Sequence, residues 1–158
     1  MARTAAPAPR DDLKIVDALA QLSFLILGTL ERRASEHDLS MIQTRLLGVL
    51  RDRTPTMNQL AKLLDLDKSS VTGLVDRAER RALVRRVPSK TDGRAVQVSL
   101  TDNGRAMVAE VAARFDSDVG AALAILPSSD RKALSVLVSR ILVAHATARG
   151  VDLFATSS

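Results

Sequence analysis

Two closely spaced amphipathic helices followed at once by a short hairpin, over residues 56–100, constrain the fold of this chain more than any other feature. Thr56 and Gln59 make a capping box that opens a short leucine-rich helix, which stops near Asp65. After a brief turn, a second helix is predicted from about Lys68 to Ala82, because its apolar residues share one helical stripe: Val71, Leu74, Val75, Ala78 and Ala82. A short helix, a tight turn and a second helix are the parts of a helix-turn-helix.

The hairpin that follows is predicted from two short strands, Leu83–Pro88 and Ala95–Leu100. Between them, the Asp92-Gly93 pair supplies the backbone angles that a tight hairpin turn needs. Apolar and polar residues alternate along the second strand, which is typical of a strand with one buried face. Pro88 lacks a backbone N–H, so its strand belongs at an edge or in the turn.

The positive charge of the chain is concentrated in this same region. The formal net charge is +5, from 23 lysines and arginines against 18 acidic residues. Residues 68–94 hold three of the acids and eight of the basic residues, namely Lys68, Arg77, Arg80, Arg81, Arg85, Arg86, Lys90 and Arg94. The basic and acidic residues of the rest of the chain therefore cancel. A local positive field attracts polyanions, and the planar guanidinium of arginine suits phosphate and guanine.

Helices are predicted on both sides of this central unit. Apolar residues recur at helical spacing from about residue 12 to 33, from the Ser40–Gln43 capping box to the break at Thr54-Pro55, from Thr101 to Pro127, and from there to about Arg149. The fold class is therefore mainly α with a small β-hairpin.

Several classes of protein are excluded or disfavoured by composition. With no cysteine, the chain has no disulfide and no thiolate metal site. Residues 18–30, the most apolar stretch, fall short of the roughly 20 residues that span a bilayer, and residues 1–14 do not resemble a secretory signal. No phosphate loop or nucleophile motif is present. We expect a cytoplasmic protein that is not an enzyme and has no catalytic residues, metal site, cofactor or membrane partner.

The exposed face of the helix over residues 68–82 has the chemistry of a DNA-reading surface. In a helix-turn-helix the second helix enters the major groove, where residues near its N-terminus contact base edges. Small hydroxyl groups, a glycine and cations allow close approach to DNA, and the predicted positions are Lys68, Ser69, Ser70, Thr72, Gly73 and Arg77. Helix capping alone would also account for the hydroxyl groups, and a basic run can simply be a solvated face.

The charged hairpin would lie beside this helix as a wing. A narrow minor groove deepens the negative potential of DNA and attracts arginine and lysine. The wing positions predicted at DNA are Arg86, Lys90, Asp92 and Arg94, with Asp92 holding the wing's shape by pairing with Arg77 or Arg94.

Residues 60–104, "LAKLLDLDKSSVTGLVDRAERRALVRRVPSKTDGRAVQVSLTDNG", resemble the winged helix of the MarR family of bacterial transcription regulators. The similar features are the "LA-x-LL" helix, the "SSVT-x-LVDR" reading helix, "LVRR" before the wing, the D-x-R of Asp92 and Arg94, and "LT-x-x-G" after it. Ala82 stands where the family usually has a glycine, which argues against a left-handed cap there. The chain also lacks the cysteine of the family's peroxide sensors and the Trp and Tyr residues of some ligand sites.

The resemblance implies a homodimer on a near-palindromic stretch of double-stranded DNA. The long apolar stripes at both ends of the chain could pack on one another, but the resemblance favours burial against a second copy. The expected organisation is a disordered tail (1–10), an N-terminal dimerisation helix (11–39), a winged helix-turn-helix (40–104), C-terminal dimerisation helices (105–150) and a tail (151–158).

Two functions remain open from the sequence. The first is a dimeric, sequence-specific DNA-binding regulator, a repressor released by a small-molecule inducer that binds near Phe24, His37, Met41 and Arg45. The second is a winged helix that docks an acidic protein partner through its basic segment and does not read DNA.

Overall fold

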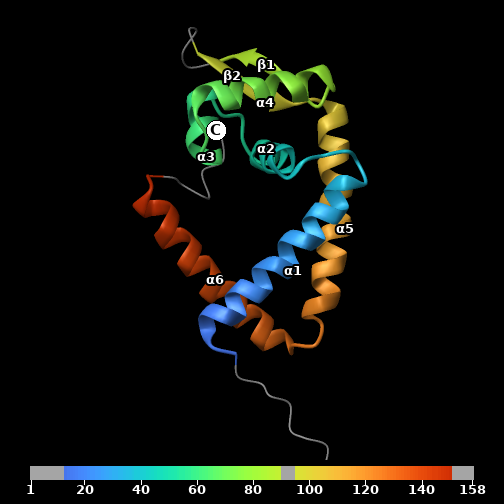
Figure 1. The fold of residues 1–158 in the computed structure, drawn as a ribbon, viewed down its shortest axis with the longest axis vertical. Helices are drawn as coiled ribbons and strands as arrows, with labels where there is room; N and C mark the ends of the chain where they lie inside the picture. Colours follow the sequence, from blue (N-terminus) through green and yellow to red (C-terminus); the bar gives the residue numbers. More distant parts are fainter. Residues whose placement is uncertain (1–12, 90–94, 151–158) are drawn as a thin grey trace, which may run out of the picture.

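The computed structural model describes residues 13–89 and 95–150, which form a winged helix with three long helices extending from it (Figure 1). In chain order the elements are α1 (Ile15–Ser35), α2 (Met41–Arg51), α3 (Met57–Leu64), α4 (Lys68–Arg80), β1 (Val84–Pro88), β2 (Val96–Leu100), α5 (Asp102–Leu123) and α6 (Ser128–Ala148). The prediction of a mainly α fold with one hairpin is confirmed. The predicted tails and the wing-tip residues Lys90, Asp92 and Arg94 lie outside the described residues.

Side-chain caps begin four of the helices. The two capping boxes predicted from sequence are both present, at Ser40 before α2 and at Thr56 before α3. Thr101 accepts a hydrogen bond from the Gly104 amide at the start of α5, and Asp67 does the same for the Ser70 amide at the start of α4. Each cap satisfies a backbone N–H that has no partner within its helix, so these starts are set locally.

Three helices end in the same way, with a non-glycine residue in the left-handed region. Asp38, Asp65 and Ala82 have φ of 53°, 58° and 53°. In each case the amide of the following leucine reaches back to a carbonyl in the last turn: Leu39 to Ala34, Leu66 to Ala61, and Leu83 to Ala78. This is the Schellman pattern. The expectation that Ala82 argues against a left-handed cap was wrong, because burial of Leu83 and the two end hydrogen bonds outweigh the strain at an alanine.

Replacing Ala82 with glycine should therefore stabilise the protein. A left-handed alanine costs about 1–2 kcal/mol, and glycine loses about 0.5–1 kcal/mol of extra chain entropy on folding. We expect the free energy of unfolding to rise by about 0.5–1 kcal/mol in urea titrations. Ala106→Gly, at an exposed right-handed position in α5, is the matched control and should lower stability by about 1 kcal/mol. An Ala82→Gly protein no more stable than the wild type would show that residue 82 is not strained.

The hydrophobic core lies within the winged helix, around α2. Its side chains come from every element except α6, and the fully buried ones include Leu46, Leu47, Leu60, Leu64, Leu74, Leu83 and Val98. The two strands pair antiparallel, with Val84 opposite Leu100. A third short segment joins them, since the Val98 amide donates to the Pro55 carbonyl at 2.9 Å. The segment after α2 thus connects the helix-turn-helix to the wing.

The three long helices pack against the winged helix very unequally. α1 lies against α5, and Arg33 makes a two-pronged ion pair with Asp118, with Nε–Oδ2 and Nη2–Oδ1 distances of 2.8 and 2.9 Å. In contrast, α6 packs little against the rest of the described chain.

None of the described helices is both long enough and apolar enough to cross a membrane.

Candidate nucleic-acid interface

A carboxylate that was not among the residues predicted from the sequence, Asp67, caps the start of α4. Asp67 accepts hydrogen bonds from the Ser69 hydroxyl at 2.5 Å, the Ser70 hydroxyl at 2.6 Å and the Ser70 amide at 2.9 Å. The serine hydroxyls, followed by the Ser70 amide, hold the pKa of Asp67 well below its usual range. The signal was an Asp directly before the first helical residue, which is a preferred N-cap.

The other predicted reading residues lie on the same exposed side of α4. Lys68 and Thr72 are exposed, and the Thr72 hydroxyl donates to the Lys68 carbonyl at 2.8 Å. Gly73 leaves room for Arg77 one turn later, because a Cβ at Gly73 would lie 3.4 Å from the Arg77 Nη1. The structure therefore brings Lys68, Ser69, Ser70, Thr72, Gly73 and Arg77 together. Their hydroxyl protons are already donated, those of the serines to the N-cap Asp67 and that of Thr72 to the Lys68 carbonyl. Outward, these hydroxyls offer acceptor lone pairs.

Arg86, predicted as a DNA contact, joins strand β1 to helix α4. Its guanidinium pairs with Asp76 at 2.6 Å and with Glu79, and its amide donates to Glu79 at 3.2 Å. Partial burial opposes the charged form, but the hydrogen bonds to Asp76 and Glu79 raise the pKa of Arg86. Its neighbour Arg85 is exposed, and its guanidinium makes no ion pair with the described residues but donates a hydrogen bond to the Ser99 hydroxyl at 3.3 Å. This geometry favours Arg85 over Arg86 as the phosphate contact from β1.

Removing the Arg86 guanidinium should loosen the wing. We expect Arg86→Met to lower the free energy of unfolding by about 1 kcal/mol, because Asp76 and Glu79 lose charged hydrogen bonds while remaining partly hydrated. Arg85→Met should change it by less than about 0.5 kcal/mol, as is usual for an exposed side chain. Equal effects of the two substitutions in urea titrations would contradict a bracing role for Arg86.

Not every basic side chain of residues 68–89 is free to meet a partner. Arg81 is committed to two backbone carbonyls, those of His37 and Asp38. Lys68, Arg77 and Arg80 make no ion pair with any described residue. Together with Arg85 they are the basic residues of α4 and β1 without an ion pair to any described residue, and we call this exposed set the basic face (Lys68, Arg77, Arg80 and Arg85). Such a surface can neutralise several phosphates of a duplex.

A cavity of about 250 Å³ lies away from this face, between α1, α2 and α5. Its walls are mainly apolar, with three polar residues, and its lining is Leu30, Leu39, Thr44, Arg45, Leu47, Gly48, Arg51, Val108, Val111, Ala112 and Phe115. Arg51 is paired with Asp52, whereas Arg45 makes no ion pair with the described residues. No group of three metal-ligating side chains forms among residues 13–89 and 95–150.

The structure brings only one of the four predicted ligand residues to this cavity, namely Arg45. Phe24 is 66% exposed on the free side of α1. Met41 is half-buried at the start of α2. The Nε2 atom of His37 is buried without a hydrogen-bond partner, 3.8 Å from a Glu110 carboxylate oxygen. The apolar lining residues Leu47, Val108 and Val111 lie in helices that were predicted from apolar spacing, and nothing in that spacing indicated a cavity.

A helix-turn-helix followed by an antiparallel hairpin, with a basic outer face, defines a winged helix-turn-helix protein. The model of the MarR family matches residues 37–95, which are thus a MarR-family winged helix, as the sequence resemblance predicted. The HTH-type transcriptional regulator PecS of Dickeya dadantii is 26% identical over 135 residues, covering 83% of this chain and 81% of PecS. The HTH-type transcriptional repressor NicR of Pseudomonas putida is 34% identical over 79 residues, covering 49% of this chain and 50% of NicR.

A solved structure has the same fold. The F27L mutant of S. aureus MepR bound to an oligodeoxyribonucleotide superposes with a TM-score of 0.59 at 20% identity, covering 84% of this chain and 99% of that one. The similarity spans the long helices as well as the winged helix.

Proposed function

We propose that this chain is a dimeric, sequence-specific DNA-binding transcription regulator that acts as a repressor. The observation that carries the proposal is the basic face beside the polar N-terminal end of α4, on a winged helix-turn-helix. PecS and NicR are transcriptional regulators by name, and the MepR structure contains an oligodeoxyribonucleotide. In this assignment α4 enters the major groove and β1 faces the adjacent phosphates.

The apolar surface of α1 and α6 supports a dimer. Nearly all of the exposed large apolar side chains of the described chain lie on or beside these two helices, including Ile15, Val16, Phe24, Leu137, Ile141 and Leu142. Apolar area of this size is costly to leave in water, at about 25 cal/mol per Å². A second copy packed through the same surface would bury it and place two reading helices on one face of a duplex.

The dimer can be tested by placing a charge in this surface. Ile141 is 60% exposed in the single chain, and Ile141→Glu should shift the protein from dimer to monomer at micromolar concentration in sedimentation equilibrium, because the carboxylate would be desolvated in the interface. Ser139→Glu, on the same helix, places the same charge outside the apolar set and should leave the dimer intact. Dissociation by both variants, or by neither, would argue against this surface as the interface.

The cavity between α1, α2 and α5 supports release by a small molecule. Its apolar walls and the Arg45 guanidinium suit a compact apolar compound with an acidic group. Because the cavity joins the winged helix to α1 and α5, an occupant would change how these parts pack. Adding aromatic acids to a protein–duplex complex should release DNA, and Arg45→Gln should weaken that response while leaving DNA affinity without the acid unchanged.

Selection of duplexes from a randomised library tests the main proposal. A DNA-reading regulator should enrich a near-palindromic sequence and bind it at least about 1000-fold more tightly than unrelated duplex at physiological salt. Weak binding with no sequence preference would favour the other function left open by the sequence, docking of an acidic protein partner on the basic face.

A further inference from the structure

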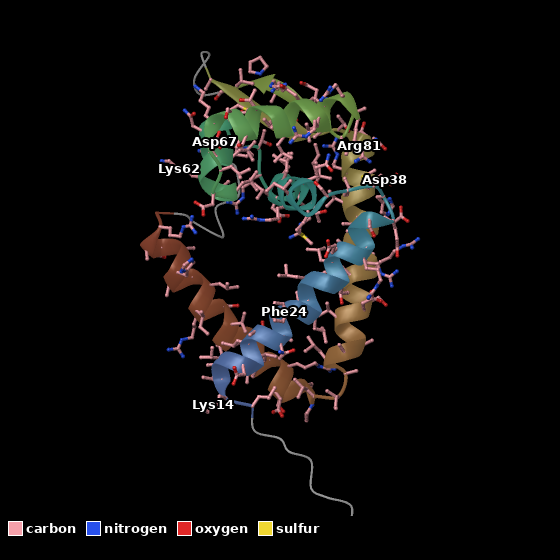
Figure 2. All side chains as sticks on the ribbon, in the orientation of Figure 1. Lys14, Phe24, Asp38, Lys62, Asp67 and Arg81 are labelled. Atoms are coloured by element: carbon pink, nitrogen blue, oxygen red, sulfur yellow. The ribbon has the colours of Figure 1, made fainter. Side chains whose placement is uncertain are left out.

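Arg81, at the C-terminal end of α4, connects the reading helix to α1. Its Nη1 donates to the Asp38 carbonyl at 2.7 Å and its Nη2 to the His37 carbonyl at 2.9 Å. Figure 2 shows Arg81 beside Asp38, with Asp67 at the opposite end of α4. One planar guanidinium therefore holds two consecutive carbonyls of the turn that follows α1, 43 and 44 residues earlier in the chain.

Hydrogen bonds hold the backbone on both sides of this contact. On the α1 side, the held carbonyls belong to the left-handed end of the helix, where the Asp38 and Leu39 amides bond back to Ser35 and Ala34. On the α4 side, Arg81 is followed by the end motif of Ala82 and Leu83, and β1 begins at the next residue. Because the planar guanidinium of Arg81 donates two N–H groups in a fixed fork, it fixes the angle between α4 and the end of α1 as well as their distance.

The contact also lies next to the cavity. Leu39 follows the two held carbonyls directly, is 6% exposed and forms part of the cavity lining. Any change in how α1, α2 and α5 pack around Leu39 therefore moves the carbonyls that Arg81 holds.

We infer that Arg81 is a positioning residue for DNA reading: its fork sets the angle between α4 and α1, and hence the spacing of the two reading helices in a dimer. The inference rests on the proposed function. In this role Arg81 does not contact DNA. If Arg81 served stability alone, Arg81→Lys would lower the free energy of unfolding and leave the arrangement of α1 and α4 in the folded protein unchanged.

The test replaces Arg81 with lysine, which keeps the charge but not the fork. The chain has no cysteine, so cysteines introduced at Glu31 in α1 and Ser69 in α4 accept spin labels at known positions. Mixing the labelled protein with an excess of unlabelled protein leaves most dimers with one labelled chain, so the measured distances are those within a chain. In the free protein, Arg81→Lys should broaden or shift the distance distribution between the labels. An unchanged distribution would overturn the inference, and this readout holds whether or not the protein binds DNA.

DNA binding provides the second readout. For the duplex selected by the wild type, Arg81→Lys should lose about tenfold in affinity, as expected for one hydrogen bond to a charged group. Affinity for unrelated duplex and the salt dependence of binding should not change, because the charge is kept and no phosphate contact is lost. The variant should also accept half-site spacings that the wild type rejects. Selected-duplex affinity within twofold of the wild type, with the same spacing preference, would overturn the inference.

Arg105→Lys is the matched control. Arg105 also donates to a backbone carbonyl, that of Leu100 at 2.9 Å, but at the start of α5 and away from the α1–α4 contact. It should leave both the label distances and the spacing preference unchanged. A wild type that binds no duplex selectively would refute the proposed function, while the label distances would still decide the role of Arg81.

Discussion

Gly104→Ala is expected to destabilise the protein by about 3 kcal/mol, more than any other single substitution considered for this chain. A Cβ at Gly104 would lie 2.0 Å from the Leu83 carbonyl oxygen and 2.9 Å from its carbon. That carbonyl cannot move freely, because it accepts the Thr101 amide at 3.0 Å, while the Thr101 hydroxyl donates to the Ala82 carbonyl at 2.6 Å. The methyl group would therefore separate α5 from the base of the wing, and urea titration measures the loss.

Gly120→Ala is the control for this prediction. Gly120 lies in the same helix, and a Cβ there would meet no atom within 4 Å in the described chain. Alanine has the higher helix propensity, so this substitution should stabilise the monomer fold by about 0.5–1 kcal/mol. If both alanine variants changed stability by similar small amounts, the close approach at Gly104 would not be a constraint on the fold.

Removing three cations of the basic face should have the largest effect on DNA binding. In the triple variant Arg77→Gln, Arg80→Gln and Arg85→Gln, each lost phosphate contact should reduce the log–log salt slope by about 0.9. At 0.1 M salt the triple variant should bind all duplexes roughly 100-fold more weakly. Fluorescence anisotropy over a range of salt concentrations measures both quantities. Stability should change little, since these side chains are exposed.

A variant with the same change in net charge separates local from overall electrostatics. Arg131, Lys132 and Arg140 are exposed on α6, far along the chain from the basic face. Their replacement by glutamine should leave the salt slope near that of the wild type. If the α6 variant lost as much affinity as the basic-face variant, net charge and not a particular surface would govern binding.

Much of the fold could be predicted from the sequence because its signals are local. The capping boxes at Ser40 and Thr56 act over three residues, and the apolar stripe of α4 over one helix length. The polar face at the start of α4 follows from the same periodicity. The local prediction at Ala82 was nevertheless wrong. The free-energy cost of a left-handed alanine is smaller than the gain from burying the side chain of Leu83, which follows it.

The roles of the arginines could not be predicted in this way. Residues 81, 85 and 86 are equivalent in a count of charge, but the structure commits Arg81 to carbonyls of the turn after α1 and Arg86 to carboxylates of α4, and leaves Arg85 exposed. Which of them meets a partner depends on which elements become neighbours.

By itself, the sequence determined the order of helices and hairpin, the family of the winged helix and the location of the excess charge, since helix periods, caps and composition depend on residues near one another in the chain. Only the tertiary structure decided which cations remain exposed, why residue 104 must be glycine, and that a cavity lies between α1, α2 and α5. These features arise where segments far apart in sequence pack together, and the contacts between such segments are not written in any local pattern.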